Sequence, residues 1–185
     1  MEVRLKRAFL FSGKDGARVV AHPYPEENRG INPHKPTFLV IFVQLAVKQL
    51  FEAGRDFLWP KPEGCPRCQG RIWGHGFVPA YFDGYDQPLW LKRYRCPDCG
   101  CVIRLRPRAY FERFQASINT IRDCLVYWVH HHRWKPGPSP PRQRHWAKAL
   151  RSHLVLHEGL NRVQDLVAGF DRLWVLGIIP VSRSL

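Results

Sequence analysis

Cys65-Pro-Arg-Cys68-Gln-Gly70 and Cys96-Pro-Asp-Cys99-Gly100 are two copies of a Cys-x-x-Cys motif, separated by 27 residues. A glycine follows each pair within two residues, and we expect it to take the left-handed backbone conformation that side chains resist. Two such knuckles joined by a hairpin can place four thiolates around one Zn²⁺. The sequence therefore predicts one structural zinc ion held by Cys65, Cys68, Cys96 and Cys99. With all four positions filled, no water is left to activate.

Three other side chains and one other chemistry compete with this prediction. A redox dithiol is the alternative, but it would need a single Cys-x-x-Cys at a helix start. Cys101 points away from its knuckle, and Cys124 lies in an apolar helical stretch, where a buried core position is expected. His75, in Gly74-His-Gly76, is an alternative ligand, although four cysteines already complete the set.

The residues around the cysteines have strand character. Residues 71–82 and 88–95 are rich in aromatic and aliphatic side chains, and a polar turn over 83–87 lies between them. A third strand is predicted over 102–105. Together with the cysteines these strands predict a zinc ribbon over residues 61–108.

The flanking segments complete an α+β fold class. Residues 3–21 predict a β-hairpin, and from Pro36 to Phe51 apolar residues fall near helical spacing, so residues 1–60 are expected to form a hairpin plus an apolar helix. Residues 109–185 predict a helical region with segments near 110–134, 141–157 and 160–176. The proline-rich linker 135–141 separates the first two segments.

Charge is concentrated in the second half of the chain. The formal net charge is +14, and residues 92–185 carry 17 basic and 6 acidic residues. Such a field favours a polyanionic partner. Nucleic acid fits better than a membrane surface, because the basic residues are mostly arginine interleaved with aromatic residues and no long basic amphipathic helix is present. A merely basic protein without such a partner is the alternative.

The motifs resemble a known group of proteins. The order Cys65-Pro-Arg-Cys68-Gln-Gly70, His75-Gly76, Arg93-Tyr-Arg-Cys-Pro-Asp-Cys-Gly100 and Arg104-Leu-Arg-Pro107 is similar to the zinc ribbon of bacterial transposition-associated proteins. It also resembles small uncharacterised proteins in which a helix-turn-helix follows the ribbon. The similarity covers residues 63–125 and extends loosely over 126–157. It implies DNA binding, with a transposase or another protein of a mobile element as a possible partner.

Two groups of side chains are predicted to contact nucleic acid. Alternation along the strands places arginines in a row suited to phosphates. Arg and Gln near the start of the 141–157 helix are types that contact base edges in the major groove. The alternative for this helix is a solvated basic surface, because the proline-rich linker departs from the tight turn of the family. The predicted contact residues are Arg93, Arg95, Arg104, Arg106, Arg108, Arg142, Gln143, Arg144, Lys148 and Arg151.

The sequence thus predicts a non-enzymatic DNA-binding protein, either a transposition accessory or targeting factor or a transcriptional regulator. Catalysis is not expected, because the acids after Leu91 are scattered and form no Mg²⁺ site. A protein–protein adaptor, favoured by the apolar 38–51 segment, and an RNA-binding protein are the alternatives. The lack of an apolar leader at Met1 and of a membrane span predicts a cytoplasmic, nucleoid-associated location in a bacterium.

Overall fold

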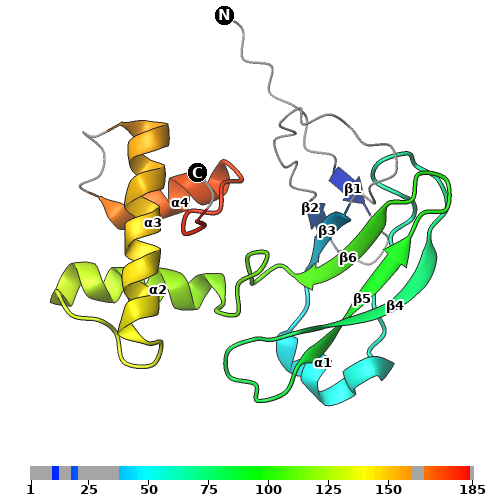
Figure 1. Ribbon diagram of the computed structural model, residues 1–185, viewed down its shortest axis with the longest axis horizontal. Helices are drawn as coiled ribbons and strands as arrows, with labels where there is room; N and C mark the ends of the chain where they lie inside the picture. Colours follow the sequence, from blue (N-terminus) through cyan, green and yellow to red (C-terminus); the bar gives the residue numbers. More distant parts are fainter. Residues whose placement is uncertain (1–9, 13–17, 21–37, 160–164, 184–185) are drawn as a thin grey trace, which may run out of the picture. The chain divides into compact units, whose positions relative to one another are not determined.

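The computed structural model describes residues 10–12, 18–20, 38–159 and 165–183 of this α+β protein. The chain divides into two compact units, Met1–Gln115 and Ala116–Leu185. Unit 1 contains the β-sheet and unit 2 contains three of the helices (Figure 1). No helix in the described part of the chain is both long and apolar enough to cross a membrane.

A six-stranded sheet organises unit 1, with the order β1-β2-β3-β6-β5-β4. Neighbouring strands are antiparallel except β3 and β6, which are parallel. The predicted strands over 71–82, 88–95 and 102–105 are present as β4, β5 and β6. The antiparallel β1–β2 pair fits the predicted N-terminal hairpin, whose other residues lie outside the described ones. The strands are β1 Leu10–Ser12, β2 Arg18–Val20, β3 Phe38–Val43, β4 Trp73–Ala80, β5 Leu89–Arg95 and β6 Val102–Pro107.

The prediction of a helix from Pro36 to Phe51 is wrong. Residues Phe38–Val43 form strand β3, and only Val47–Ala53 form a helix, α1, which continues into the 3-10 turn Gly54–Asp56 (η1). The run Phe-Leu-Val-Ile-Phe-Val is rich in β-branched and aromatic residues, and β3 has a neighbouring strand on each side. A continuous apolar run of this length fits a central strand as well as a buried helix, so periodicity alone does not separate them.

Strand β3 also changes the domain division. It pairs with β6 along its full length, from Phe38 opposite Val102 to Val43 opposite Pro107, and the Arg108 amide donates to the Val43 carbonyl at 2.9 Å. Residues 1–60 and 61–108 were predicted as separate parts. The described structure joins them in one sheet, and unit 1 ends at Gln115 rather than at residue 108.

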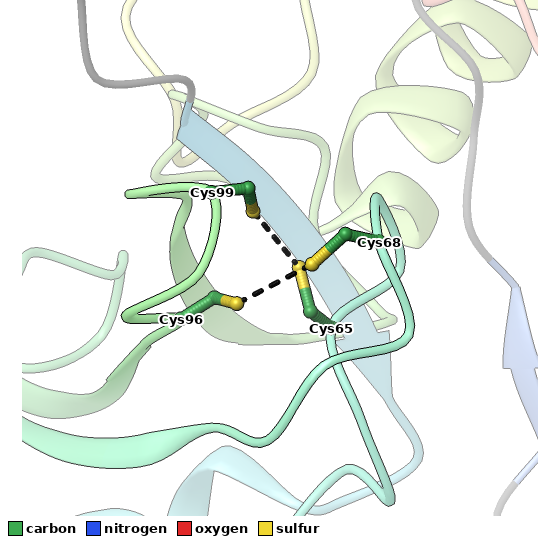
Figure 2. Close-up of side chains that lie close together, drawn as sticks. All are labelled: Cys65, Cys68, Cys96 and Cys99. Carbon is green, nitrogen blue, oxygen red and sulfur yellow. Dashed lines mark hydrogen bonds between the residues drawn. The ribbon is translucent and has the colours of Figure 1, made fainter.

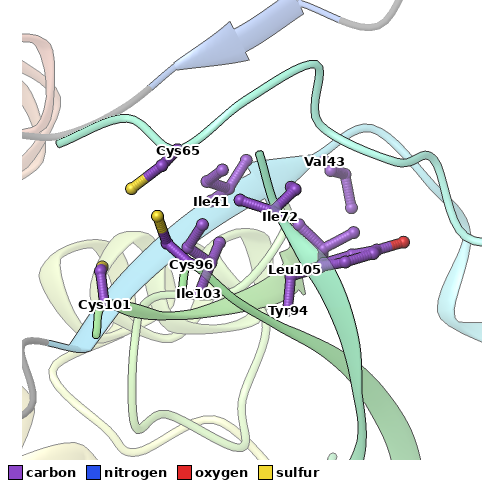
Figure 3. Close-up of a cluster of buried hydrophobic side chains, with 9 residues drawn as sticks. All are labelled: Ile41, Val43, Cys65, Ile72, Tyr94, Cys96, Cys101, Ile103 and Leu105. Atoms are coloured by element: carbon purple, nitrogen blue, oxygen red, sulfur yellow. The ribbon is translucent and has the colours of Figure 1, made fainter. Parts of the chain in front are cut away.

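One face of the sheet, the core face, is covered by the chain between η1 and β4. Ile41, Ile103 and Leu105 are almost completely buried there (Figure 3). Cys65 and Ile72, from the covering segment, belong to the same apolar cluster. The cysteine knuckles are therefore part of the hydrophobic core of unit 1.

The opposite face, which we call the arginine face, is covered at one end by apolar residues of the described part of the chain. There Leu91 packs with Leu50 of α1 and with Phe82 and Tyr110 from the adjoining loops. Arg93, two residues beyond Leu91, and Arg104, its direct partner on β6, lie on the same face at the other end. That end, which we call the open half, carries no apolar cluster among the described residues, although Val102 there is only 8% exposed.

Unit 2 is built from three helices, α2 Ile118–His131, α3 Pro140–Glu158 and α4 Leu166–Val175. They correspond to the three predicted helical segments, although α2 begins later than predicted. The Ser117 hydroxyl accepts a hydrogen bond from the Thr120 amide at the start of α2, which is an N-cap. At Gly169 on α4 an added Cβ would come within 2.6 Å of the buried Leu154 side chain on α3, which would have to shift. Two bidentate ion pairs, Arg122–Asp171 and Arg172–Glu158, join the helices.

Candidate metal centre and basic surfaces

Two turns of the same construction present the cysteines. In the first, the Cys65 amide donates to the Gly70 carbonyl at 2.9 Å; in the second, the Cys96 amide donates to the Cys101 carbonyl at 2.9 Å. The first turn precedes β4, and the second connects β5 to β6. Because β4 and β5 form an antiparallel hairpin, the two turns meet at the same end of the sheet.

The four sulfur atoms of these turns form one compact cluster. The Cys65 and Cys99 sulfurs are 3.6 Å apart, and those of Cys68 and Cys96 are 3.4 Å apart (Figure 2). All four lie within 4.8 Å of one another. Four thiolates bound at ~2.3 Å to one tetrahedral metal would lie about 3.8 Å apart. The cluster therefore has the dimensions of a site for one metal ion.

The left-handed residues of the two turns are not both glycine. Gly100 has φ +67° in the second knuckle, but in the first the equivalent residue is Gln69, with φ +62°. The prediction that glycine takes this position holds only for the second knuckle. At Gly70 an added Cβ would lie 2.0 Å from a carboxylate oxygen of Asp98, so a side chain there would displace the exposed Asp98 carboxylate.

Burial and backbone amides determine how exposed the sulfurs are and, for Cys96, how readily the thiol loses its proton. Cys65 and Cys96 are fully buried, whereas Cys68 is exposed. Burial disfavours the Cys96 thiolate, but hydrogen bonds from the Cys99 and Asp98 amides and from neighbouring cysteines outweigh it and lower the pKa of Cys96. Amide-to-sulfur hydrogen bonds of this kind stabilise the deprotonated form that binds metal.

The competing ligands lie outside the cluster. Among the described residues, the four cysteines are the only group of His, Cys, Asp or Glu side chains arranged to hold a metal ion. His75 is exposed, in an irregular stretch of β4 opposite Arg93. Cys101 is buried, and burial raises the pKa of its thiol to about 12. Cys124 is buried in unit 2, as predicted for a core residue.

Strand pairing brings three of the predicted arginines together. Arg93 and Arg104 are direct cross-strand partners on β5 and β6. Arg95, two residues along β5, lies on the same face and is exposed. Within the described residues none of the three forms an ion pair. Arg108 is exposed just beyond the end of β6.

Arg106 does not belong to this surface, contrary to prediction. Its side chain is only 4% exposed, its Nε donates to the Phe111 carbonyl at 3.1 Å, and its Nη2 donates to the Phe114 carbonyl at 2.5 Å. Burial lowers the pKa of this guanidinium to about 10. Alternation did put Arg104 and Arg106 on one face, but Phe82 and the 110–114 segment cover that face at Arg106. Arg106 is therefore an internal brace.

Helix α3 carries the second predicted group of contacts, and the structure divides it. Arg144 and Lys148 are exposed and one helical turn apart. Arg151 is also exposed, with its guanidinium 4.8 Å from the ring centre of Trp128 on α2. Arg142 is half-buried, 5.1 Å from the ring centre of Trp146. These four residues remain candidates for phosphate contact.

Gln143 is not a candidate for base contact, contrary to prediction. It is 1% exposed, and its amide nitrogen donates to the carbonyls of Lys135 and Pro138, at 2.7 and 2.6 Å. Its amide oxygen accepts from the Lys135 backbone N–H at 3.0 Å. The side chain thus satisfies three backbone groups of the linker between α2 and α3.

We expect Gln143→Glu to destabilise unit 2 by about 2–3 kcal/mol, because a carboxylate would face two carbonyl oxygens with no proton to donate. Thermal unfolding followed by the helical circular dichroism signal measures this. The adjacent substitution Arg144→Gln is the control and should change stability by less than about 0.5 kcal/mol. Equal stability of the two variants would contradict the role given to Gln143.

Sequence reasoning missed two exposed aromatic residues beside the arginines. Trp73 is 60% and Phe38 is 66% exposed. Trp73 lies directly opposite Arg95, and Phe38 directly opposite Val102. The alternation of side chains along the predicted strand 71–82 could have placed Trp73 on the same face as the arginines. Phe38 was hidden because its segment was assigned to a helix.

No family model, curated protein or solved structure matches this chain. Its functional assignment rests on the geometry of the cysteine cluster and of the basic surfaces.

Proposed function

We propose that this chain is a non-enzymatic DNA-binding protein whose sheet is braced by one structural zinc ion. The observation that carries the proposal is the cross-strand pair Arg93–Arg104 with the exposed Arg95 beside it, unpaired with any described carboxylate. Like charges directly opposite one another destabilise a sheet. An anion bound between them removes that cost, and a phosphate of nucleic acid is the anion that the +14 charge of the chain attracts.

The donor set supports zinc in a structural role. Tetrahedral four-sulfur sites hold zinc or iron, and a filled thiolate shell leaves no position for a reacting water. Two of the ligands, Cys65 and Cys96, are also members of the hydrophobic core. We therefore assign the metal to folding, and the binding of DNA to the surface that it makes rigid.

Helix α3 supplies a second basic surface, in unit 2. Arg144 and Lys148 are exposed on it. A helix with basic side chains near its start suits a duplex groove or its phosphates. The helix-turn-helix assignment is part of this proposal, with α2, the linker and α3 as its elements.

The biological setting is proposed from the resemblance of the cysteine motifs: an accessory or targeting factor of a mobile element, or a transcriptional regulator. The adaptor alternative loses part of its support, because the apolar segment that favoured it contains strand β3, which pairs with β2 and β6 inside the sheet. RNA binding rests on the same arginines and is tested by competition between duplex DNA and RNA.

Duplex binding measured by fluorescence anisotropy between about 50 and 200 mM salt tests the proposal. The double variant Arg93→Gln/Arg104→Gln should lower the slope of log affinity against log salt by about 2, one for each phosphate contact. Arg113→Gln, in the same unit but at an exposed position beside Glu112, is the control and should leave the slope unchanged. Absence of duplex binding at low salt would refute the proposal.

A further inference from the structure

The open half of the arginine face combines arginines with exposed aromatic rings. We propose that this surface binds single-stranded DNA, with bases stacked on Trp73 and Phe38 and phosphates held by Arg93, Arg95 and Arg104. This inference rests on the proposed DNA binding and specifies the form of DNA that this surface takes.

Strand register places the residues in two adjacent rows. The first row crosses β4, β5, β6 and β3 as Trp73, Arg95, Val102 and Phe38, each the direct partner of the next. The second row holds Arg93, Arg104 and Val40. Direct partners share one face of a sheet, so an aromatic ring lies at each end of the first row and the three guanidinium groups lie between or beside them.

Exposure of both rings is unusual for their position. Trp73 and Phe38 are more than half exposed, whereas Ile41, Tyr94 and Ile103 on the core face of the same sheet are at most 5% exposed. Base stacking on exposed rings is the main sequence-tolerant contact of proteins that bind single strands. In a duplex the faces of the bases are already stacked on one another, so these rings have nothing to stack on.

The width of the surface also favours a single strand. Trp73 and Phe38 lie on the two outer strands of the four adjacent strands β4, β5, β6 and β3, so they are separated across the sheet by roughly 14 Å. The major groove of B-DNA is about 12 Å wide and admits a helix or a two-stranded ribbon. A four-stranded face is too broad to enter this groove, so a duplex would contact the face only through its phosphates. An extended single strand can cross the face from one ring to the other.

The arginines require an anion rather than an apolar protein partner. The Nε of Arg93 is buried without a hydrogen-bond acceptor among the described residues. An apolar partner would bury Arg93, Arg95 and Arg104 further and leave three charges unpaired, which is costly. Phosphate oxygens placed between β5 and β6 would supply the opposite charge to the accessible nitrogens of these guanidinium groups.

The donors on this surface favour DNA over RNA. The polar atoms of Arg93, Arg95, Arg104 and Trp73 are donors only. Recognition of RNA at a given site uses its 2′-hydroxyl as donor and acceptor, and these side chains have no acceptor for its proton.

The test compares an oligodeoxythymidylate of about 12 nucleotides with a duplex of the same length, using the full-length, metal-loaded protein. Trp73→Ala should weaken single-strand binding by about 5- to 150-fold, the range for one stacked base, and leave duplex binding within about 2-fold. Trp73→Phe should restore most of the loss, and Phe38→Ala should reproduce it. Tyr81→Ala, which removes another exposed aromatic ring of unit 1, is the control and should change neither affinity.

The outcomes separate this inference from the proposed function. If Trp73→Ala and Phe38→Ala leave single-strand binding unchanged, or weaken duplex binding equally, the inference is wrong while the DNA-binding function stands. Tighter binding of the matching oligoribonucleotide would overturn the choice of DNA. If the wild-type protein bound neither single-stranded nor duplex nucleic acid, both proposals would be refuted.

Discussion

Replacing Cys96 with alanine is expected to unfold unit 1. Cys96 is both a member of the four-sulfur cluster and a fully buried residue of the core. Metal binding contributes about 10–16 kcal/mol to the folding of small zinc sites, which is comparable to the whole ~5–15 kcal/mol net stability of a typical domain. The variant should therefore lose its metal and the cooperative unfolding of the sheet.

Cys101 provides a matched control, because it is also fully buried, lies in the same apolar cluster and loses the same atoms on substitution with alanine. Cys101→Ala should retain one metal ion per chain and lose only about 1–2 kcal/mol of stability. Elemental analysis and thermal unfolding measure both effects. A wild-type chain that contains iron would refute zinc but keep the metal site, and equal behaviour of the two variants would refute the ligand set.

A strong chelator should reproduce the effect of Cys96→Ala in the wild-type protein, since the metal then leaves without any change in sequence. The helical signal of unit 2 is expected to persist, because no metal-ligating cluster lies in its described residues. Simultaneous loss of both signals would contradict the division of the chain at Gln115 and Ala116.

The second large effect is expected for Arg106→Met. The guanidinium of Arg106 donates to the carbonyls of Phe111 and Phe114, and methionine would leave both without this donor. Hydrogen bonds from charged groups contribute about 1.5–3 kcal/mol each, so we expect a loss of about 3–5 kcal/mol in the stability of unit 1. Denaturant unfolding of the metal-loaded protein measures this loss.

Arg104→Met is the matched control, because Arg104 lies on the same face as Arg106 but is assigned to DNA binding rather than to stability. Arg104 is two residues from Arg106 on β6, but it is only half-buried and forms no ion pair with a described residue. We expect its replacement to change stability by less than about 1 kcal/mol and to weaken DNA binding. If Arg106→Met were equally mild for stability, the brace assigned to Arg106 would be wrong.

The cysteine cluster could be predicted from the sequence because its determinants are local. Each knuckle is a turn of a few residues, and the β4–β5 hairpin that joins the two follows from alternating apolar residues around a polar turn. Nothing distant in the chain is needed to bring Cys65 near Cys99.

Strand β3 could not be predicted in the same way. Its partner β6 lies 64 residues further along the chain, as the pairing of Phe38 with Val102 shows. A run of six apolar residues has no periodicity that separates a central strand from a buried helix. The parallel pairing that decides the matter is a tertiary interaction, absent from any local pattern.

Arg106 and Gln143 failed as predicted contacts for a related reason. Both side chains are polar, of types that bind nucleic acid, and near other basic residues. Their actual partners are backbone carbonyls, at Phe111 and Phe114 for Arg106 and at Lys135 and Pro138 for Gln143. Which backbone carbonyls need a hydrogen-bond donor is decided only when the loops fold. Residue type alone therefore could not separate an internal hydrogen-bond donor from a residue that contacts nucleic acid.

The parallel pairing of β3 with β6 has a consequence for the order of folding. Bringing Phe38 to Val102 closes a loop that contains both knuckles. A metal ion that first joins Cys65 to Cys99 shortens this loop by about half, which reduces the entropic cost of closing it by about 0.6 kcal/mol. We therefore expect the metal to bind before β3 pairs with β6, so that metal accelerates refolding of unit 1 as well as stabilising its final state.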